Sequence, residues 1–164
     1  MDSWEQVLRR DIRRSARVAI IGVGNAARGD DAAGAFAARD LLGGRLPLPE
    51  KALVVDAGEV PENFTGVVRA FAPDLAVIVD SAAAGRPPGA VFLLDPSEVA
   101  DEDVSTHRVP LTRLARYIRE TMDCRVSILG IEPASFKEGA PVSPAVGRAV
   151  RRVVSALRSA LDAG

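Results

Sequence analysis

The sequence predicts an α/β fold in which a mostly parallel sheet is covered by helices on both faces. Short, uniformly apolar segments, typical of strands buried on both faces, recur along the chain. Segments of helical periodicity separate most of them, and this alternation favours a parallel sheet. The chain has 164 residues, 48% hydrophobic and 26% charged, as is typical of one globular domain. We therefore expect a single domain over residues 1–164.

The first part of the chain is expected to form a helix, a strand and a second helix. Trp4, Leu8 and Ile12 are spaced so that they share one face of a short amphipathic helix. The apolar run at residues 17–23 predicts a buried strand. Residues 32–42 are rich in Ala and Leu and are followed by two glycines, which predicts a helix that stops there.

The middle of the chain is expected to contain three strands and one helix. Residues 52–56 and 75–80 are apolar runs that each end in an aspartate, and both predict buried strands. Pro61 is expected to begin a helix that ends near Phe71, because the first turn does not need the missing proline N–H. Residues 90–94 follow the preceding strand too closely for a helical crossover. We therefore expect this strand to be antiparallel or to lie at a sheet edge.

The last part is expected to add a helix, a strand and a long carboxyl-terminal helix. Residues 110–120 have helical periodicity, and residues 124–131 form a further apolar run. Ser143 and Pro144 are expected to cap and open the final helix. Its apolar stripe consists of Val146, Val150, Val153, Leu157 and Leu161.

Composition excludes several classes of function. The net charge is −1, so there is no basic excess that would favour nucleic acid as a partner. No apolar run approaches the roughly 18 residues of a membrane span, and residues 1–17 are too charged for a secretory signal, so we expect a cytoplasmic protein without a membrane partner. The single cysteine, Cys124, excludes an intrachain disulfide and is expected to be a small core residue.

Acidic residues follow three of the predicted strands. Asp30 and Asp31 come after the first strand, Asp56 ends the second and Asp80 ends the third, while His107 lies in a loop before a helix. Sites in open α/β sheets form at the carboxyl ends of the strands, and carboxylates with one imidazole suit Ni²⁺ or Zn²⁺. Each residue also has a structural interpretation, since acids at strand ends often cap helices or form turns and a lone histidine often packs or caps.

Two other chemistries are weakly indicated. The glycine loop from Gly22 to Gly29 partly matches a dinucleotide-binding loop, but its third glycine is displaced and no phosphate-binding lysine is present. The glycines can instead permit a tight turn that places the following aspartates. Ser81 follows Asp80, which makes a Ser–His–Asp triad conceivable, but the chain lacks a Gly-x-Ser-x-Gly elbow.

A set of short motifs in fixed order resembles the hydrogenase maturation endopeptidases, proteases that trim the carboxyl-terminal tail of the large subunit of nickel–iron hydrogenases. The likeness runs from about Val18 to Leu161. The segment 56–63 and an aspartate at position 31 are similar to the branch that processes cytoplasmic, formate-hydrogenlyase-like hydrogenases. The motifs are Ile21-Gly22-Val23-Gly24-Asn25, Gly29-Asp30-Asp31, Asp80, Pro88-Gly89, Thr106-His107-Arg108-Val109-Pro110-Leu111 and Leu129-Gly130-Ile131-Glu132-Pro133.

The resemblance implies a three-layer α/β/α sandwich with a five-stranded, mostly parallel mixed sheet, to which residues 1–15 are a helical extension. It also implies that Asp31, Asp80 and His107 bind a nickel ion that the precursor carries, for which zinc or another divalent ion can substitute. Asp31 and Asp80 are in addition the candidate catalytic residues, in the sense of an aspartyl-type peptidase. Four residues are expected to shape the loop that presents Asp31, namely Gly24, Asn25, Gly29 and Asp30.

The expected function is therefore that of a cytoplasmic endopeptidase that activates a hydrogenase by removing the carboxyl-terminal extension of its large-subunit precursor after nickel insertion. Two routes of hydrolysis remain open, polarisation of the scissile carbonyl by the metal and general-base attack through an aspartate. Two rival functions also remain open. One is a non-catalytic, nickel-dependent chaperone or scaffold for the same precursor, and the other is a small-molecule hydrolase or nucleotide-binding protein of similar fold.

Overall fold

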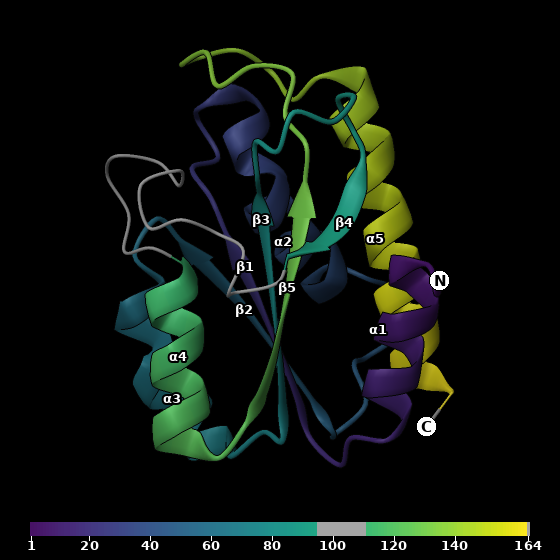
Figure 1. Cartoon of the computed structure of the whole chain (residues 1–164), viewed down its shortest axis with the longest axis vertical. Helices are drawn as coiled ribbons and strands as arrows, with labels where there is room; N and C mark the ends of the chain where they lie inside the picture. Colours follow the sequence, from purple (N-terminus) through teal and green to yellow (C-terminus); the bar gives the residue numbers. More distant parts are fainter. Residues whose placement is uncertain (95–110, 164) are drawn as a thin grey trace.

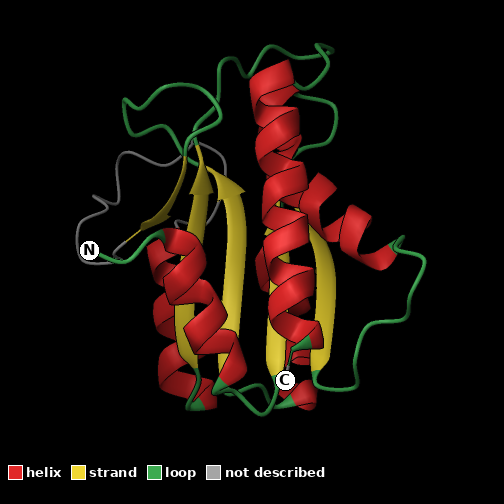
Figure 2. Cartoon of the chain, turned by 90° about the vertical axis from the view of Figure 1, so that its right-hand side faces the viewer, coloured by secondary structure: helices red, strands yellow, loops and turns green. Residues whose placement is uncertain are grey.

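The computed structural model describes residues 1–94 and 111–163, which form a five-stranded sheet between two layers of helices (Figures 1 and 2). The strand order is β2-β1-β3-β5-β4, and all neighbouring pairs are parallel except β4 with β5. The sheet thus confirms the predicted mixed topology, with the fourth strand both antiparallel and at an edge. The strands are β1 Val18–Val23, β2 Ala52–Gly58, β3 Leu75–Ser81, β4 Val91–Leu94 and β5 Arg125–Ile131.

Helices cover both faces of the sheet, which confirms the three-layer α/β/α sandwich. The helices α1, α2 and α5 pack on one face, and α3 and α4 pack on the other (Figure 1). No helix in the described part of the chain is long and apolar enough to cross a membrane. The helices are α1 Trp4–Arg13, α2 Ala33–Leu42, α3 Thr65–Phe71, α4 Leu111–Met122 and α5 Pro144–Asp162, with 3₁₀ turns η1 Gly29–Ala32 and η2 Pro61–Phe64.

The structure corrects three of the predicted elements. The helices expected from Ala32 and from Pro61 each begin with a 3₁₀ turn, so the α-helical parts start at Ala33 and Thr65. The strand β2 is only partly buried, although its apolar run predicted burial on both faces. It lies at the edge of the sheet and pairs with β1 alone, so one side of it has no neighbouring strand.

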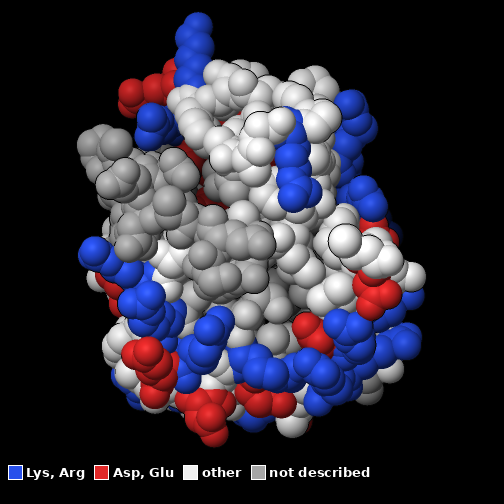
Figure 3. Space-filling view, in the orientation of Figure 1, with Lys and Arg blue, Asp and Glu red and all other residues white. Residues whose placement is uncertain are grey.

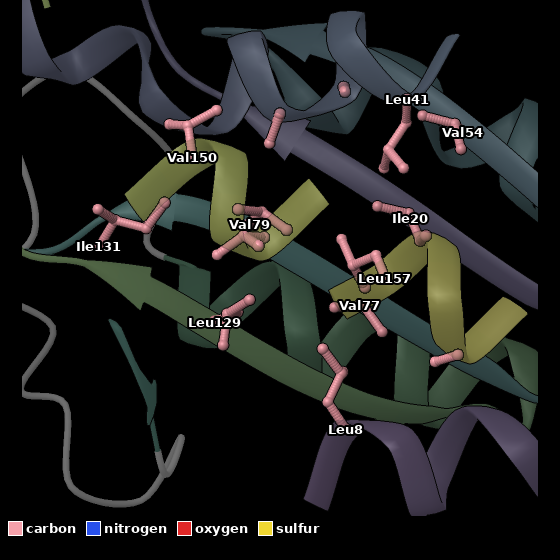
Figure 4. Close-up of a cluster of buried hydrophobic side chains, with 14 of the residues drawn as sticks. Leu8, Ile20, Leu41, Val54, Val77, Val79, Leu129, Ile131, Val150 and Leu157 are labelled. Carbon is pink, nitrogen blue, oxygen red and sulfur yellow. The ribbon is translucent and has the colours of Figure 1, made fainter. Parts of the chain in front are cut away.

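Alternate side chains of each inner strand fill two separate hydrophobic cores, as the two-residue period of a strand requires. In β3, Val77 and Val79 face the core under α1, α2 and α5 (Figure 4), whereas Ala76 and Ile78 face the core under α3 and α4. Ser81, the next residue of the first series, therefore lies on the α2 side at the end of the strand. Asp80 belongs to the other series.

The amino-terminal helix α1 is packed on the body of the domain. Its residues Leu8 and Ile12 are buried in the same core as α5. The guanidinium of Arg152 in α5 lies 2.6 Å from the Glu5 carboxylate and stacks over the Trp4 ring at 5.2 Å. The helix thus covers the lower part of α5, away from the carboxyl edge of the parallel strands (Figure 1).

The close approach of α2 to the sheet depends on two glycines, Gly22 in β1 and Gly34 in α2. A Cβ atom at Gly22 would overlap the carbonyl oxygen of Gly34. A Cβ atom at Gly34 would overlap the carbonyl oxygens of Val79 in β3 and Val23 in β1. The helix can therefore rest directly on the backbone of the two strands only because these positions have no side chain. This contact sets how closely α2, and the turn η1 that precedes it, approach the sheet.

We expect Gly34→Ala to lower the free energy of unfolding by at least about 2 kcal/mol, because α2 must move away from β1 and β3 to admit a methyl group. Gly66→Ala is the matched control. Gly66 is exposed in α3 and a Cβ there meets nothing within 4 Å, so its free energy of unfolding should stay the same or rise by up to about 1 kcal/mol. Urea denaturation of both variants measures the difference. Equal stability of the two variants would contradict the packing constraint.

Candidate active site

Buried polar side chains gather at the carboxyl edge of the parallel strands, the upper end of the molecule in Figure 1. Figure 3 shows acidic atoms recessed below the surface near this edge. Proteins rarely bury acidic groups without hydrogen-bond partners, so their contacts indicate what each group does. The buried polar residues at this edge are Asp30, Asp31, Asp80, Ser81 and Glu132.

The carboxylates of Asp31 and Asp80 meet at one serine hydroxyl. Ser81 Oγ lies 3.2 Å from Asp31 Oδ1 and 3.5 Å from Asp80 Oδ1. The backbone N–H of Ser81 also donates to Asp80 Oδ1 at 2.8 Å, and the backbone N–H of Asn25 donates to Asp31 Oδ2 at 3.3 Å. The fold thus brings together two predicted site residues that are far apart in the sequence.

The alternative interpretation of Asp31 as a helix cap is wrong. The α-helix α2 starts at Ala33, its N-cap residue is Ala32, and no side chain caps it. Asp31 lies inside the 3₁₀ turn η1, and its carboxylate accepts hydrogen bonds from the loop after β1 and from the end of β3.

Asp30 points away from this pair and holds a different part of the chain. Its Oδ2 accepts hydrogen bonds from the backbone N–H groups of Ala134 at 2.7 Å and Ser135 at 3.2 Å. The N–H of Ser143 donates to Oδ1 at 2.7 Å, and the Ser143 hydroxyl donates to Oδ2 at 2.9 Å. Asp30 therefore fastens the loop between β5 and α5 to the turn that carries Asp31.

The expected cap of α5 is correspondingly different. Ser143 is the N-cap residue and Pro144 opens the helix, as predicted, but the serine side chain makes no capping bond within α5. Its hydroxyl is used by Asp30 instead. Burial acts to raise the pKa of Asp30, but the hydrogen bonds from Ser143, Ala134 and Ser135 outweigh it and hold the pKa below its ordinary value of 3.8.

The loop between β1 and η1 is shaped by Gly24, Asn25 and Gly29. A Cβ at Gly24 would overlap the carbonyl oxygen of Asp31, so the loop can close on the aspartate only with glycine there. Gly29 has φ +56°, and a Cβ there would lie 2.8 Å from the carbonyl oxygen of Ser135. The Asn25 side chain accepts the N–H of Ala27 at 2.9 Å and stabilises the turn.

Asp56, the third acid expected at a strand end, is not part of the carboxylate pair. Its Oδ2 accepts a hydrogen bond from Arg39 Nε at 2.7 Å, on the outer side of the sheet where β2 forms the edge. Cys124 is buried, as expected of a core residue. Burial and the nearby Asp74 carboxylate raise its pKa to about 11, so the thiol stays protonated at neutral pH.

Two residues that hold the site are not identified in that role by the sequence. The sequence suggests Ser81 only as a nucleophile, although its hydroxyl lies near both carboxylates. Glu132 directly follows β5, and its Oε2 accepts the N–H of Ala84 at 2.8 Å, which fixes the loop after β3. The available signal was position alone, because both residues lie at the carboxyl end of an apolar run.

The third predicted ligand, His107, lies outside the described residues. Within the described ranges, no group of three or more His, Cys, Asp or Glu side chains is placed to hold a metal ion. What these ranges supply is the pair of carboxylates at the Ser81 hydroxyl. Carboxylate oxygens are ligands that divalent cations accept, and a pair leaves further coordination positions open.

Similarity to known proteins first defines the class, proteases that mature hydrogenases. The chain is 31% identical to the hydrogenase 3 maturation protease of Escherichia coli K12 over 141 residues, which cover 84% of this chain and 86% of that protein. It resembles the crystal structure of the nickel–iron hydrogenase maturation protease HycI from Thermococcus kodakarensis, with 33% identity, a TM-score of 0.87 and coverage of 95% and 99%. It also resembles the solution structure of the endopeptidase HycI from Escherichia coli, with 29% identity and a TM-score of 0.77, over 87% of this chain and 90% of that chain.

A family model described as HycI, hydrogenase maturation protease, matches residues 39–160. The chain therefore belongs to the HycI hydrogenase maturation protease family. It is an enzyme, a peptide hydrolase that acts in hydrogenase maturation. This assignment agrees with the function that the order of the sequence motifs predicted.

We expect Asp30→Asn to lower the free energy of unfolding by about 2 kcal/mol or more at pH 7. The amide N–H groups of asparagine would face the donors that now bond to the Asp30 carboxylate, and these hydrogen bonds would be lost. A carboxylate with a depressed folded pKa stabilises above its unfolded pKa and loses that contribution as the pH falls through the folded value. The difference from wild type should therefore shrink below about pH 3.8. Urea unfolding between pH 3 and 7 measures it, and a pH-independent difference would contradict the anchoring role.

Proposed function

We propose that this protein removes the carboxyl-terminal extension from the large-subunit precursor of a nickel–iron hydrogenase after nickel has been inserted. The observation that carries the proposal is the meeting of Asp31 and Asp80, two buried carboxylates from separate elements, at the carboxyl edge of the sheet. Two carboxylates at such close range repel each other in a protein interior, and a divalent cation removes that repulsion. The pair is therefore suited to meet a cation.

In this proposal the cation is the nickel that the precursor already holds. Asp31, Asp80 and His107 act as its ligands on the protease side, and zinc can replace it as a probe. Three protein ligands leave positions open for the ligands of the precursor, which a docking site for a substrate-borne ion requires. The same contact explains how cleavage can depend on nickel insertion, because an empty precursor lacks the ion that the carboxylates recognise.

Hydrolysis of the peptide bond needs an activated water. We assign the activation of this water to the carboxylate pair, in which one carboxylate takes a proton from the water as it attacks the scissile carbonyl. Cys124 is unsuited to nucleophilic attack, because its thiol is buried and protonated at neutral pH. The resemblance to proteases of cytoplasmic hydrogenases leads us to place the reaction in the cytoplasm, where the precursor is the partner.

We expect Asp80→Ala and His107→Ala each to reduce processing at least about 100-fold, because each change removes a ligand of the nickel, and Asp80→Ala also removes a candidate base. The measurement is the mass of a nickel-loaded precursor after incubation with each variant. Asp56→Ala is the matched control, since this carboxylate also ends a strand but pairs with Arg39 outside the site. It should process the precursor at a rate close to that of wild type.

Two results would contradict the proposal. Wild-type protein that binds the precursor without shortening it would favour the scaffold function. Full processing by His107→Ala or by Asp80→Ala would show that the substituted residue is not needed in the site, provided that circular dichroism shows the same fold for all variants.

A further inference from the structure

Ser81 contributes two donors to the carboxylate pair. It is the last residue of β3, pairs with Ile131 of β5 in the sheet register, and is 7% exposed. Its backbone N–H donates to Asp80, and its hydroxyl lies within 3.5 Å of an oxygen of each carboxylate. Asp80 and Ser81 belong to opposite faces of the sheet. Because Ser81 ends the strand, its side chain can nevertheless reach the carboxylates of both Asp31 and Asp80.

A serine hydroxyl has one proton and two lone pairs, so it donates to one carboxylate oxygen at a time. The two oxygens near Ser81 Oγ therefore compete for the same proton, and the hydroxyl is within reach of both. A carboxylate has about four lone-pair sites on its two oxygens, more than the two hydrogen bonds that Ser81 can donate to it, so a carboxylate that accepts from Ser81 can still coordinate a cation. The hydroxyl can thus orient the acids without occupying their metal-binding capacity.

We propose that Ser81 is a positioning residue that holds Asp31 and Asp80 as a preformed pair for a divalent cation. The inference rests on the proposed function and adds a residue to its site. Hydrogen-bond partners of metal-binding side chains typically change metal affinity 10- to 100-fold when they are removed. Ser81 is placed to be such a partner for both acids, whereas Asn25 contacts only Asp31.

The test is a calorimetric titration of the untagged full chain with Ni²⁺ alone. Ser81→Ala removes one oxygen and adds no atom, and its dissociation constant for Ni²⁺ should rise at least about tenfold. Ser81→Thr keeps the hydroxyl and should stay within about threefold of wild type. This rescue by the conservative variant separates a role of the hydroxyl from a role of the side-chain volume.

Ser15→Ala is the matched control. It also removes a buried serine hydroxyl, but one that bonds the Asp11 carbonyl and the Arg125 side chain at the amino end of β5, the opposite edge of the sheet. Its melting temperature should fall while its affinity for Ni²⁺ stays at the wild-type value. Processing of the nickel-loaded precursor is measured in parallel for all variants.

Ser81→Ala with wild-type Ni²⁺ affinity would overturn the inference, as would equal weakening of Ni²⁺ binding in Ser15→Ala. A Ser81→Ala variant that loses all processing at unchanged Ni²⁺ affinity would also overturn it, because that pattern indicates a nucleophile. If the wild-type protein processes the precursor but binds no free Ni²⁺, the inference of a preformed pair is wrong, whereas the proposed function is unaffected. If the wild-type protein does not process the precursor at all, both the proposed function and this inference are wrong.

Discussion

The geometry of the candidate site depends on the buried carboxylate of Asp30. It accepts four hydrogen bonds from the loop between β5 and α5, and these join residues that are 104 to 113 positions apart in the sequence. A carboxylate that loses its hydration on burial must find such donors, so the loop and the turn η1 are fixed to each other. Asp31 is the next residue in that turn and owes its position to this anchor.

The second support comes from the sheet. The strand β3 lies between β1 and β5, is fully buried, and ends in Asp80 and Ser81. Gly34 lets α2 rest on the backbone of β1 and β3, which brings η1 close to the end of β3. Two rigid parts of the fold thus deliver one carboxylate each to the same hydroxyl, and neither carboxylate depends on a flexible loop alone. Such support favours the fixed geometry that recognition of a metal ion and hydrolysis both need.

Most of the fold could be predicted from the sequence, because its signals are local. The apolar runs and helical stripes identify each strand and helix, and the short connection before residues 90–94 identifies an antiparallel edge strand. Asp31 and Asp80 could be singled out because they follow strands. Asp56 has the same local pattern and yet pairs with Arg39 of α2, a contact between separate elements that leaves no mark in the apolar runs. The bonds from Asp30 to Ser143 and from Ser81 to Asp31 have no local signature at all, because they depend on contacts between distant segments.

In the function proposed above, the carboxylate pair recognises a nickel ion carried by the hydrogenase precursor. The most direct test is to incubate the wild-type protein with nickel-loaded and with nickel-free precursor, and to compare the masses of the large subunit. We expect the nickel-loaded precursor alone to lose a carboxyl-terminal peptide. Equal shortening of both precursors, or shortening of neither, would contradict this expectation.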